Sequence, residues 1–110
     1  MPGRHNISNA LASAAVCLEL EVPMKQLQKA LNGFTGVDRR FSIRADLTYQ
    51  QQPLTIIDDY GHHPTEITAT LQTARSLEPN RIVALFQPHR YSRTERLAAE
   101  FGKALQGADL

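Results

Sequence analysis

The sequence has one cysteine, no tryptophan and no long apolar run. A single thiol, Cys17, excludes an internal disulfide and cannot form a metal site by itself. The uninterrupted apolar stretches are only a few residues long, whereas a helix that crosses a bilayer needs about 20 apolar residues. The N-terminus also lacks the charged and then apolar pattern of a signal peptide. These absences favour a cytoplasmic protein that does not enter a membrane.

Neither sign of charge is in clear excess. The 110 residues include 12 lysines and arginines and 11 aspartates and glutamates, which leaves a net charge of +1. Such a balance produces no overall field that would attract nucleic acid or an anionic membrane. The hydrophobic fraction of 42% and the charged fraction of 21% are those of a globular protein. The length allows one domain or parts of two.

The first third of the sequence predicts a helical hairpin. Apolar residues recur at helical spacing over residues 7–20, which predicts a helix with one apolar face formed by Ile7, Leu11, Ala14, Ala15 and Leu18. Asn6 is a candidate N-cap for this helix. A second helix is expected from about Pro23 to Leu31, with Gly33 as its C-cap. Two short helices have too little core to be stable alone.

The remainder of the sequence predicts an α/β fold. Strands are expected over residues 41–49, 54–57 and 81–86, and helices over residues 65–77 and 93–105. Ser92 and Glu95 have the spacing of a capping box for the last helix. A strand, a helix and a strand in succession predict a parallel sheet with a right-handed crossover. The change of pattern falls between Gly33 and Arg40, and the residues after Gly107 resemble the start of a further strand. We therefore expect the chain to be a piece of a longer protein.

Two polar loops follow the predicted strands that end at Ile57 and Phe86. The first reads Asp58-Asp59-Tyr60-Gly61-His62-His63-Pro64, and the second reads Gln87-Pro88-His89-Arg90-Tyr91-Ser92-Arg93-Thr94. Ligands of open α/β sheets bind beyond the carboxyl ends of the strands, so both loops are expected on one rim. Arg90 and Arg93, with His89, would then form a receptor for a carboxylate or a phosphate. The alternative is that Asp58, Asp59 or Glu66 neutralise these arginines in internal ion pairs.

The histidines of the first loop allow three interpretations. His62 or His63 could bind a divalent ion together with Asp58 or Asp59, although no third strong ligand is evident. His62 could act as a general base, because the ordinary pKa of histidine lies near neutrality. It could equally be a structural histidine that is hydrogen-bonded to loop backbone. Gly61 is expected to adopt a backbone conformation that other residues resist.

Three polar residues lie together at the start of the first predicted helix. Asn6 and Asn9 are separated by three residues, and His5 and Asn9 by four, so they share one face of a helix. Amide groups of this kind can read the edge of an adenine, and a histidine ring can stack on a base. The simpler alternative is a capping Asn6 and a solvated Asn9. Arg40 could contact a phosphate or lie in a solvated linker.

These segments together resemble the Mur ligase family. The resemblance rests on Gly3-Arg4-His5-Asn6-Ile7-Ser8-Asn9-Ala10, on Arg39-Arg40-Phe41, and on the two loops described above, and it covers essentially the whole chain. It implies that residues 1–37 are the C-terminal helical tail of a central ATP-binding domain. Residues 38–110 would then be the first part of a Rossmann-like C-terminal domain with the order β-β-α-β-α.

The loop motifs are most similar to those of the family branch that adds L-alanine to UDP-N-acetylmuramate. The resemblance implies an ATP-dependent, amide-forming ligase of peptidoglycan synthesis that works through an acyl phosphate. Two alternatives remain. One is the related ligase that joins recycled tripeptide to the same nucleotide sugar, from which Tyr60-Gly61 and the second loop distinguish this chain. The other is a non-catalytic nucleotide-binding module.

The resemblance also implies roles for individual residues. Nucleotide binding falls to His5, Asn6, Asn9, Arg40 and Asp59, and catalysis to Arg40, Asp59 and His62. Substrate binding falls to Tyr60, His62, His89, Arg90 and Arg93. The family's phosphate loop, its Mg²⁺ ligands and its carbamylated lysine would all lie before residue 1, and no G-x-x-x-x-G-K-[ST] sequence is present here. We therefore expect the 110-residue chain alone to be inactive.

Overall fold

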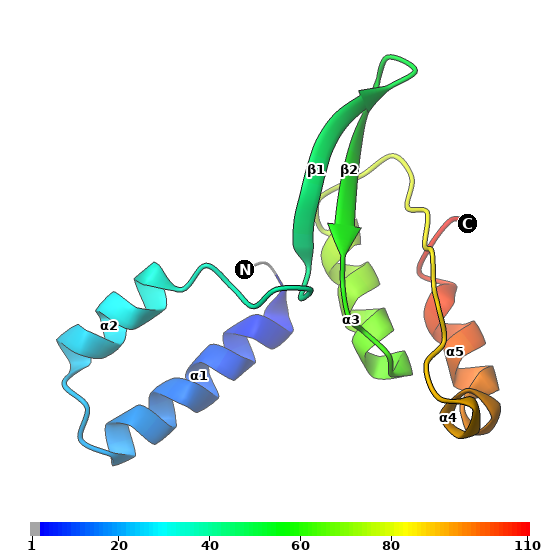
Figure 1. Ribbon diagram of the computed structural model, residues 1–110. Helices are drawn as coiled ribbons and strands as arrows, with labels where there is room; N and C mark the ends of the chain where they lie inside the picture. Colours follow the sequence, from blue (N-terminus) through cyan, green and yellow to red (C-terminus); the bar gives the residue numbers. More distant parts are fainter. Residues whose placement is uncertain (1–2) are drawn as a thin grey trace. The chain divides into compact units, whose positions relative to one another are not determined.

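The computed structural model describes residues 3–110, and these residues form two compact units (Figure 1). The first unit ends at Asp38 and the second spans Arg39–Leu110. The division lies one residue from the domain boundary expected from the sequence; the assignment of each part to a particular Mur ligase domain stays a prediction. No helix in the described part of the chain is long and apolar enough to span a bilayer.

The first unit consists of two helices, α1 (Arg4–Glu19) and α2 (Met24–Gly33). Both helices were predicted, but their ends differ from the expectation. The N-cap of α1 is Gly3, with a φ of 102°, and Asn6 lies inside the first turn. The predicted cap was wrong because glycine adopts this left-handed φ without strain. Likewise Gly33 is the last residue of α2 rather than its C-cap, which is Phe34.

The apolar face predicted for α1 is present but is not covered within this unit. Ile7 is 62% exposed and Leu11 is 66% exposed, and among the described residues of this unit Leu27 of α2 is the buried apolar side chain. Two helices bury only the strip along which they touch. The helical periodicity therefore predicted the secondary structure of α1 correctly, but the large apolar side chains of its predicted apolar face are exposed.

The second unit begins with an antiparallel hairpin. Strand β1 (Ser42–Tyr49) pairs with β2 (Gln52–Asp58), and Gln50 and Gln51 form the turn with φ values of 48° and 63°. Two successive positive φ values match the twist of a two-residue hairpin turn. A register shift at Ile43–Ala45 marks a bulge near the start of β1. The hairpin ends at Asp58 and leads directly into the first polar loop.

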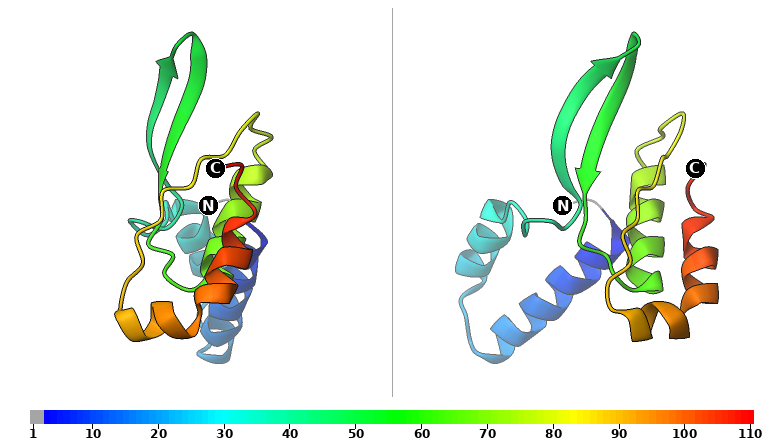
Figure 2. Two further views of the ribbon diagram at one scale, coloured as in Figure 1. Left: turned by 90° about the vertical axis from the view of Figure 1, so that its right-hand side faces the viewer. Right: turned by 45° about the vertical axis from the view of Figure 1, so that its right-hand side comes forward.

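Three helices follow in this unit: α3 (Pro64–Arg75), α4 (Tyr91–Arg96) and α5 (Ala98–Leu105). The helices α3 and α5 lie side by side (Figures 1 and 2). Their facing side chains form the core with the segment before α4; its buried members are Ile67, Leu71, Ile82, Phe101 and Ala104. The single helix predicted over residues 93–105 is interrupted at Leu97, where φ is −111°. This core fixes the positions at which the two polar loops begin and end.

The segment over residues 81–86 is extended but is not a strand of the described sheet, which contains β1 and β2 alone. Alternate side chains point to opposite sides, since Ile82 is 9% exposed and Leu85 is fully exposed. Two backbone hydrogen bonds join this segment to the chain terminus, from Asp109 N–H to the Ile82 carbonyl and from Ala84 N–H to the Leu110 carbonyl. The prediction of a strand over residues 81–86 that pairs in parallel with β2 was therefore wrong for the described residues. A strand requires a neighbouring strand that completes the ladder of hydrogen bonds.

Candidate functional site

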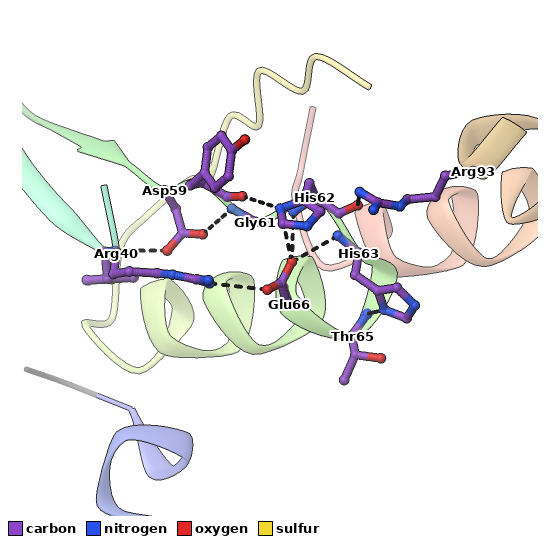
Figure 3. Close-up of polar contacts among 10 residues, drawn as sticks. Arg40, Asp59, Gly61, His62, His63, Thr65, Glu66 and Arg93 are labelled. Carbon is purple, nitrogen blue, oxygen red and sulfur yellow. Dashed lines mark hydrogen bonds and ion pairs between the residues drawn. The ribbon is translucent and has the colours of Figure 1, made fainter. Parts of the chain in front are cut away.

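The two polar loops meet in the second unit, as the sequence predicted. Nη1 of Arg93, on α4, donates a hydrogen bond of 3.4 Å to the carbonyl oxygen of His62, in the loop before α3 (Figure 3). The two residues are 31 positions apart in the sequence. The contact places a guanidinium group against the loop that carries both histidines.

Glu66 organises the start of α3. The N-cap is His63, whose Nδ1 accepts from the N–H of Thr65 at 3.3 Å. The Oε2 atom of Glu66 reaches back and accepts the N–H groups of His63 at 3.1 Å and His62 at 2.9 Å. Oε1 lies 3.2 Å from Nη1 of Arg40 (Figure 3). One carboxylate thus completes a capping box, fixes the loop and holds an arginine from the start of the unit.

Asp59 fixes the other side of the same loop. Its Oδ2 accepts the N–H of Phe41 at 2.8 Å and its Oδ1 accepts the N–H of Gly61 at 2.7 Å. Phe41 is buried and has a φ of 50°, so the carboxylate holds a left-handed turn against the loop. Gly61 was predicted to adopt a special backbone conformation, and this was wrong, since its φ is not in the left-handed region. Glycine is required there by space: an added Cβ would lie 2.8 Å from Oδ1 of Asp59.

Replacing Gly61 by alanine should therefore destabilise the chain. Oδ1 of Asp59 cannot move away from a new methyl group without losing its hydrogen bond to the N–H of residue 61. We expect the free energy of unfolding to fall by about 1–3 kcal/mol, measured by urea denaturation. Gly102→Ala is the matched control, because Gly102 lies in α5 with open space around it and alanine favours helix. An unchanged stability of Gly61→Ala would contradict this steric account.

Aromatic and cationic groups cover the outer part of the loop. The guanidinium of Arg39 lies over the Tyr60 ring, 4.9 Å from its centroid, and the Tyr60 and His62 rings meet edge to face at 5.2 Å. The N–H of Tyr60 donates to the carbonyl of Arg39 at 2.7 Å. Tyr60 remains 46% exposed despite these contacts.

The second loop and α4 form a cationic depression. A hollow of about 280 Å³ is lined by Arg90, Ser92, Arg93 and Arg96. Within the described residues, no ion pair joins these arginines to a carboxylate. The candidate acids are engaged elsewhere, because Asp58 pairs with Arg39 and Arg44 and Glu66 pairs with Arg40. An anion receptor therefore fits the described geometry better than internal neutralisation.

The start of α4 differs from the expected capping box. The N-cap is Arg90, with a φ of 71° and no capping side chain, and the helix begins at Tyr91. Ser92 and Glu95 lie inside the helix, so their predicted capping box was wrong. His89 precedes the N-cap and is exposed. The arginines are brought together by a short helix, which places Arg93 and Arg96 three residues apart on one face.

The carboxylate of Glu66 is held in its charged form. Partial burial opposes ionisation, but hydrogen bonds from the His62 backbone and from Arg40 outweigh it, so the pKa of Glu66 lies below its ordinary 4.5. Because the pKa of Glu66 is lower in the folded chain than in the unfolded chain, its charge stabilises the fold at any pH above the unfolded pKa. This stabilisation is lost as the pH falls through the folded pKa.

We therefore expect the chain to lose stability in acid through Glu66. The urea midpoint of the wild-type chain should fall on acidification below a pH of about 4.5, and that of Glu66→Gln should fall less. Asp109, whose pKa is also lowered by the Ile82 N–H and Arg75, titrates in both proteins and cancels in the comparison. Parallel pH profiles of the two proteins would contradict this assignment.

The predicted adenine-binding residues lie in the first unit. His5 and Asn9 are exposed and Asn6 is partly buried, all within the first two turns of α1. Their spacing places them on neighbouring positions of one helix face, as expected. They lie outside the unit that contains the two loops, and their role in nucleotide binding stays a prediction.

The loop that carries His62 and His63 is not part of a cluster of metal-binding side chains within the described residues. These residues contain no group of three or more histidine, cysteine, aspartate or glutamate side chains that could hold a metal ion. Asp58 and Asp59, the acids considered as ligands of His62 or His63, are occupied by arginines and by backbone N–H groups respectively. Within residues 3–110, the acids considered as metal ligands thus already have other partners.

Glu66 is the residue whose importance sequence reasoning underestimated. It was considered only as an acid that could neutralise the arginines, whereas it joins His62, His63 and Arg40. Its position three residues after His63 and just before an apolar helix is the spacing of a capping box, and this signal could have identified it. The hydrogen bond from Phe41 to Asp59 left no such signal, because it joins residues 18 positions apart.

Comparisons with known proteins identify relatives of this chain. Residues 39–110 match the family model described as Mur ligase, glutamate ligase domain. The UDP-N-acetylmuramate–L-alanine ligase of Hydrogenovibrio crunogenus is 56% identical over 110 residues, which are 99% of this chain and 24% of that protein. The ligase of the same name from Solibacter usitatus is 51% identical over 109 residues, which are 99% of this chain and 22% of that protein.

A solved structure gives the same result. The crystal structure of the UDP-N-acetylmuramate–alanine ligase of Thermotoga maritima matches 99% of this chain with a TM-score of 0.77 and 43% identity, and the match covers 23% of that chain. The present chain thus spans about a quarter of the length of these relatives. The α/β fold class is confirmed, and the chain belongs to the Mur ligase family.

Proposed function

We propose that this chain is part of a ligase that uses ATP to join L-alanine to UDP-N-acetylmuramate in peptidoglycan precursor synthesis. Family membership and 51–56% identity to ligases of that name support the proposal. In it, residues 1–37 are the helical tail of the ATP-binding domain and residues 38–110 open the C-terminal domain. A cytoplasmic location belongs to the same proposal, because the reaction consumes ATP.

The observation that carries the proposal is the meeting of the two loops. The hydrogen bond from Arg93 to the His62 carbonyl brings a cluster of unneutralised arginines next to a loop with an imidazole and a phenol. Such a surface suits a substrate with negative charge and a group that must lose a proton. Both features are required for amide formation from a carboxylate and an amine.

The proposed chemistry has two steps. An oxygen of the muramyl carboxylate attacks the terminal phosphorus of ATP, which forms an acyl phosphate and releases ADP. The amine nitrogen of L-alanine then attacks the carbonyl carbon, and the C–O bond to phosphate breaks. Arg90 and Arg93, with His89, would stabilise the charge on the phosphate and orient the carboxylate of alanine. His62 would accept the proton that the amine loses, and Tyr60 would line the acceptor site.

The nucleotide side of the proposal uses residues from both units. His5, Asn6 and Asn9 would contact the adenine, and Arg40 the phosphates. Asp59 would contact the nucleotide from the second unit, in addition to the two backbone N–H groups that it already accepts. Mg²⁺ would assist phosphoryl transfer through ligands outside this chain.

The test uses the complete ligase that contains this chain. The purified enzyme is supplied with ATP, Mg²⁺ and UDP-N-acetylmuramate, and phosphate release is measured with L-alanine, with the recycled tripeptide or without an acceptor. We expect release that depends on L-alanine. Release with tripeptide alone would support the related recycling ligase. ATP binding without release under any condition would support a non-catalytic nucleotide-binding module, and either result would overturn the proposal.

A further inference from the structure

Glu66 makes more contacts than the start of a helix requires. A capping box needs one hydrogen bond from the N3 side chain to the N-cap backbone, which here is the bond from His63 N–H. The same Oε2 atom also accepts the His62 N–H and lies 3.6 Å from Nδ1 of the His62 ring. Oε1 pairs with Arg40, which is 26 positions away in the sequence. Three of the four contacts therefore serve groups other than the helix cap.

The groups around Nδ1 of His62 favour a proton on that nitrogen. Nδ1 lies 3.0 Å from the carbonyl oxygen of Tyr60 and 3.6 Å from Oε2 of Glu66. Both neighbours are acceptors, so a neutral ring places its hydrogen on Nδ1 and leaves the lone pair on Nε2. The His62 side chain is 32% exposed, so the ring remains accessible to a ligand. A general base requires such an accessible lone pair.

The charged groups around this ring are arranged asymmetrically. Glu66 faces Nδ1, whereas Arg93 from α4 contacts the His62 backbone carbonyl. Arg40 is held on the far oxygen of Glu66, so the carboxylate lies between a guanidinium and the imidazole (Figure 3). One charged side chain thus connects the arginine at the start of the unit to the histidine of the loop.

We propose that Glu66 is a positioning residue that holds His62 with Nδ1 protonated and Nε2 free to accept the proton of the incoming amine, while it keeps Arg40 beside the same loop. The proposal rests on the proposed ligase function for its chemical step. Its structural part, the protonation site of the ring, can be tested on the chain itself.

Glutamine at position 66 separates this role from helix capping. A glutamine side-chain oxygen can accept backbone N–H groups in a capping box as glutamate does. Its amide NH₂ would then face Arg40 in place of Oε1, and the negative charge next to Nδ1 is lost. Glu66→Gln therefore keeps the cap and removes the charge. Glu66→Ala removes both and reports the cost of the lost cap.

The experiment combines a spectroscopic and a kinetic measurement. Nitrogen-15 NMR of the imidazole rings in the chain should find His62 protonated on Nδ1 in the wild type, with a larger fraction protonated on Nε2 in Glu66→Gln. In the complete ligase, Glu66→Gln should lower kcat with L-alanine by roughly 10-fold or more and leave the KM for UDP-N-acetylmuramate within about 3-fold. Glu100→Gln, an exposed acid on α5, is the matched control and should change neither measurement.

The outcomes separate the two proposals. An unchanged His62 spectrum in Glu66→Gln, or a kcat within about 2-fold of wild type, would overturn the positioning role. A wild-type enzyme that releases no phosphate with L-alanine would overturn the proposed function instead. In that case the ring spectrum still decides the protonation site. A melting temperature that falls as far in Glu66→Gln as in Glu66→Ala would show that Glu66 acts through stability, which also contradicts the proposal.

Discussion

Replacing Arg93 by alanine should lower the turnover of the complete ligase by roughly 10²–10³-fold, the effect of removing one preorganised donor from a site of developing charge. The expected change in stability is small, about 0–1 kcal/mol, because Arg93 makes a single long hydrogen bond to the His62 carbonyl and no ion pair within the described residues. The measurements are L-alanine-dependent phosphate release and thermal unfolding of the same preparation.

Two further variants make this result specific. Arg93→Lys keeps the charge but loses the planar fork, so it should recover only part of the turnover. Arg81→Ala removes an exposed arginine outside the cationic depression and should leave turnover within about 2-fold of wild type. If Arg93→Ala damaged stability and turnover to the same extent, its role would be structural and the anion receptor would be disproved.

Replacing Asp59 by alanine should have the largest effect on the stability of the second unit. The N–H groups of Phe41 and Gly61 would both lose their acceptor in a partly buried place. Each unsatisfied buried donor costs about 1–3 kcal/mol, and both donors are only partly buried, so we expect a combined loss in the lower part of the range for two donors, about 2–4 kcal/mol, measured by urea denaturation. The amide hydrogens of Phe41 and Gly61 should exchange faster with solvent, whereas those in the middle of α3 should change only with global stability.

Asp46→Ala is the matched control for this effect. Its carboxylate accepts a hydrogen bond of 2.6 Å from the Thr55 hydroxyl on the exposed hairpin, so its loss leaves no buried donor unsatisfied. We expect a cost of about 1 kcal/mol or less. Asp59→Asn should fall between wild type and alanine, because an amide offers one acceptor oxygen for two donors. Unchanged exchange at Phe41 in Asp59→Ala would refute the proposed anchor.

Local pattern predicted most of the helices and both strands of the hairpin. Apolar spacing is a property of short segments, and the helices α1, α2 and α3 and the strands β1 and β2 all appear within a few residues of the expected bounds. The failures lie where a neighbour decides the outcome. The segment over residues 81–86 has the alternation of a strand but lacks the ladder partners that would define one. The break at Leu97 carried no periodic signal.

The candidate site shows the same division. The two loops were predicted from residue type, and their meeting from a parallel pair of strands. The described residues do not form that pair, but the contact between Arg93 and His62 joins the two loops all the same. The choice between an anion receptor and internal ion pairs remained open, because it depends on which carboxylate each arginine reaches. The structure assigns Asp58 and Glu66 to Arg39, Arg44 and Arg40, which leaves Arg90 and Arg93 to the depression.

The sequence by itself determined the family, the helical and hairpin segments and the polar residues of both loops, since these depend on residue type and short-range spacing. Tertiary structure alone decided which arginine or backbone N–H group each acid contacts and which loop Arg93 reaches. Among those contacts, the ones from Arg40, Phe41 and Arg93 have lengths of about 3 Å and join residues that are 18–31 positions apart. Hydrogen bonds and ion pairs at such separations depend on how the chain packs, which local spacing does not encode.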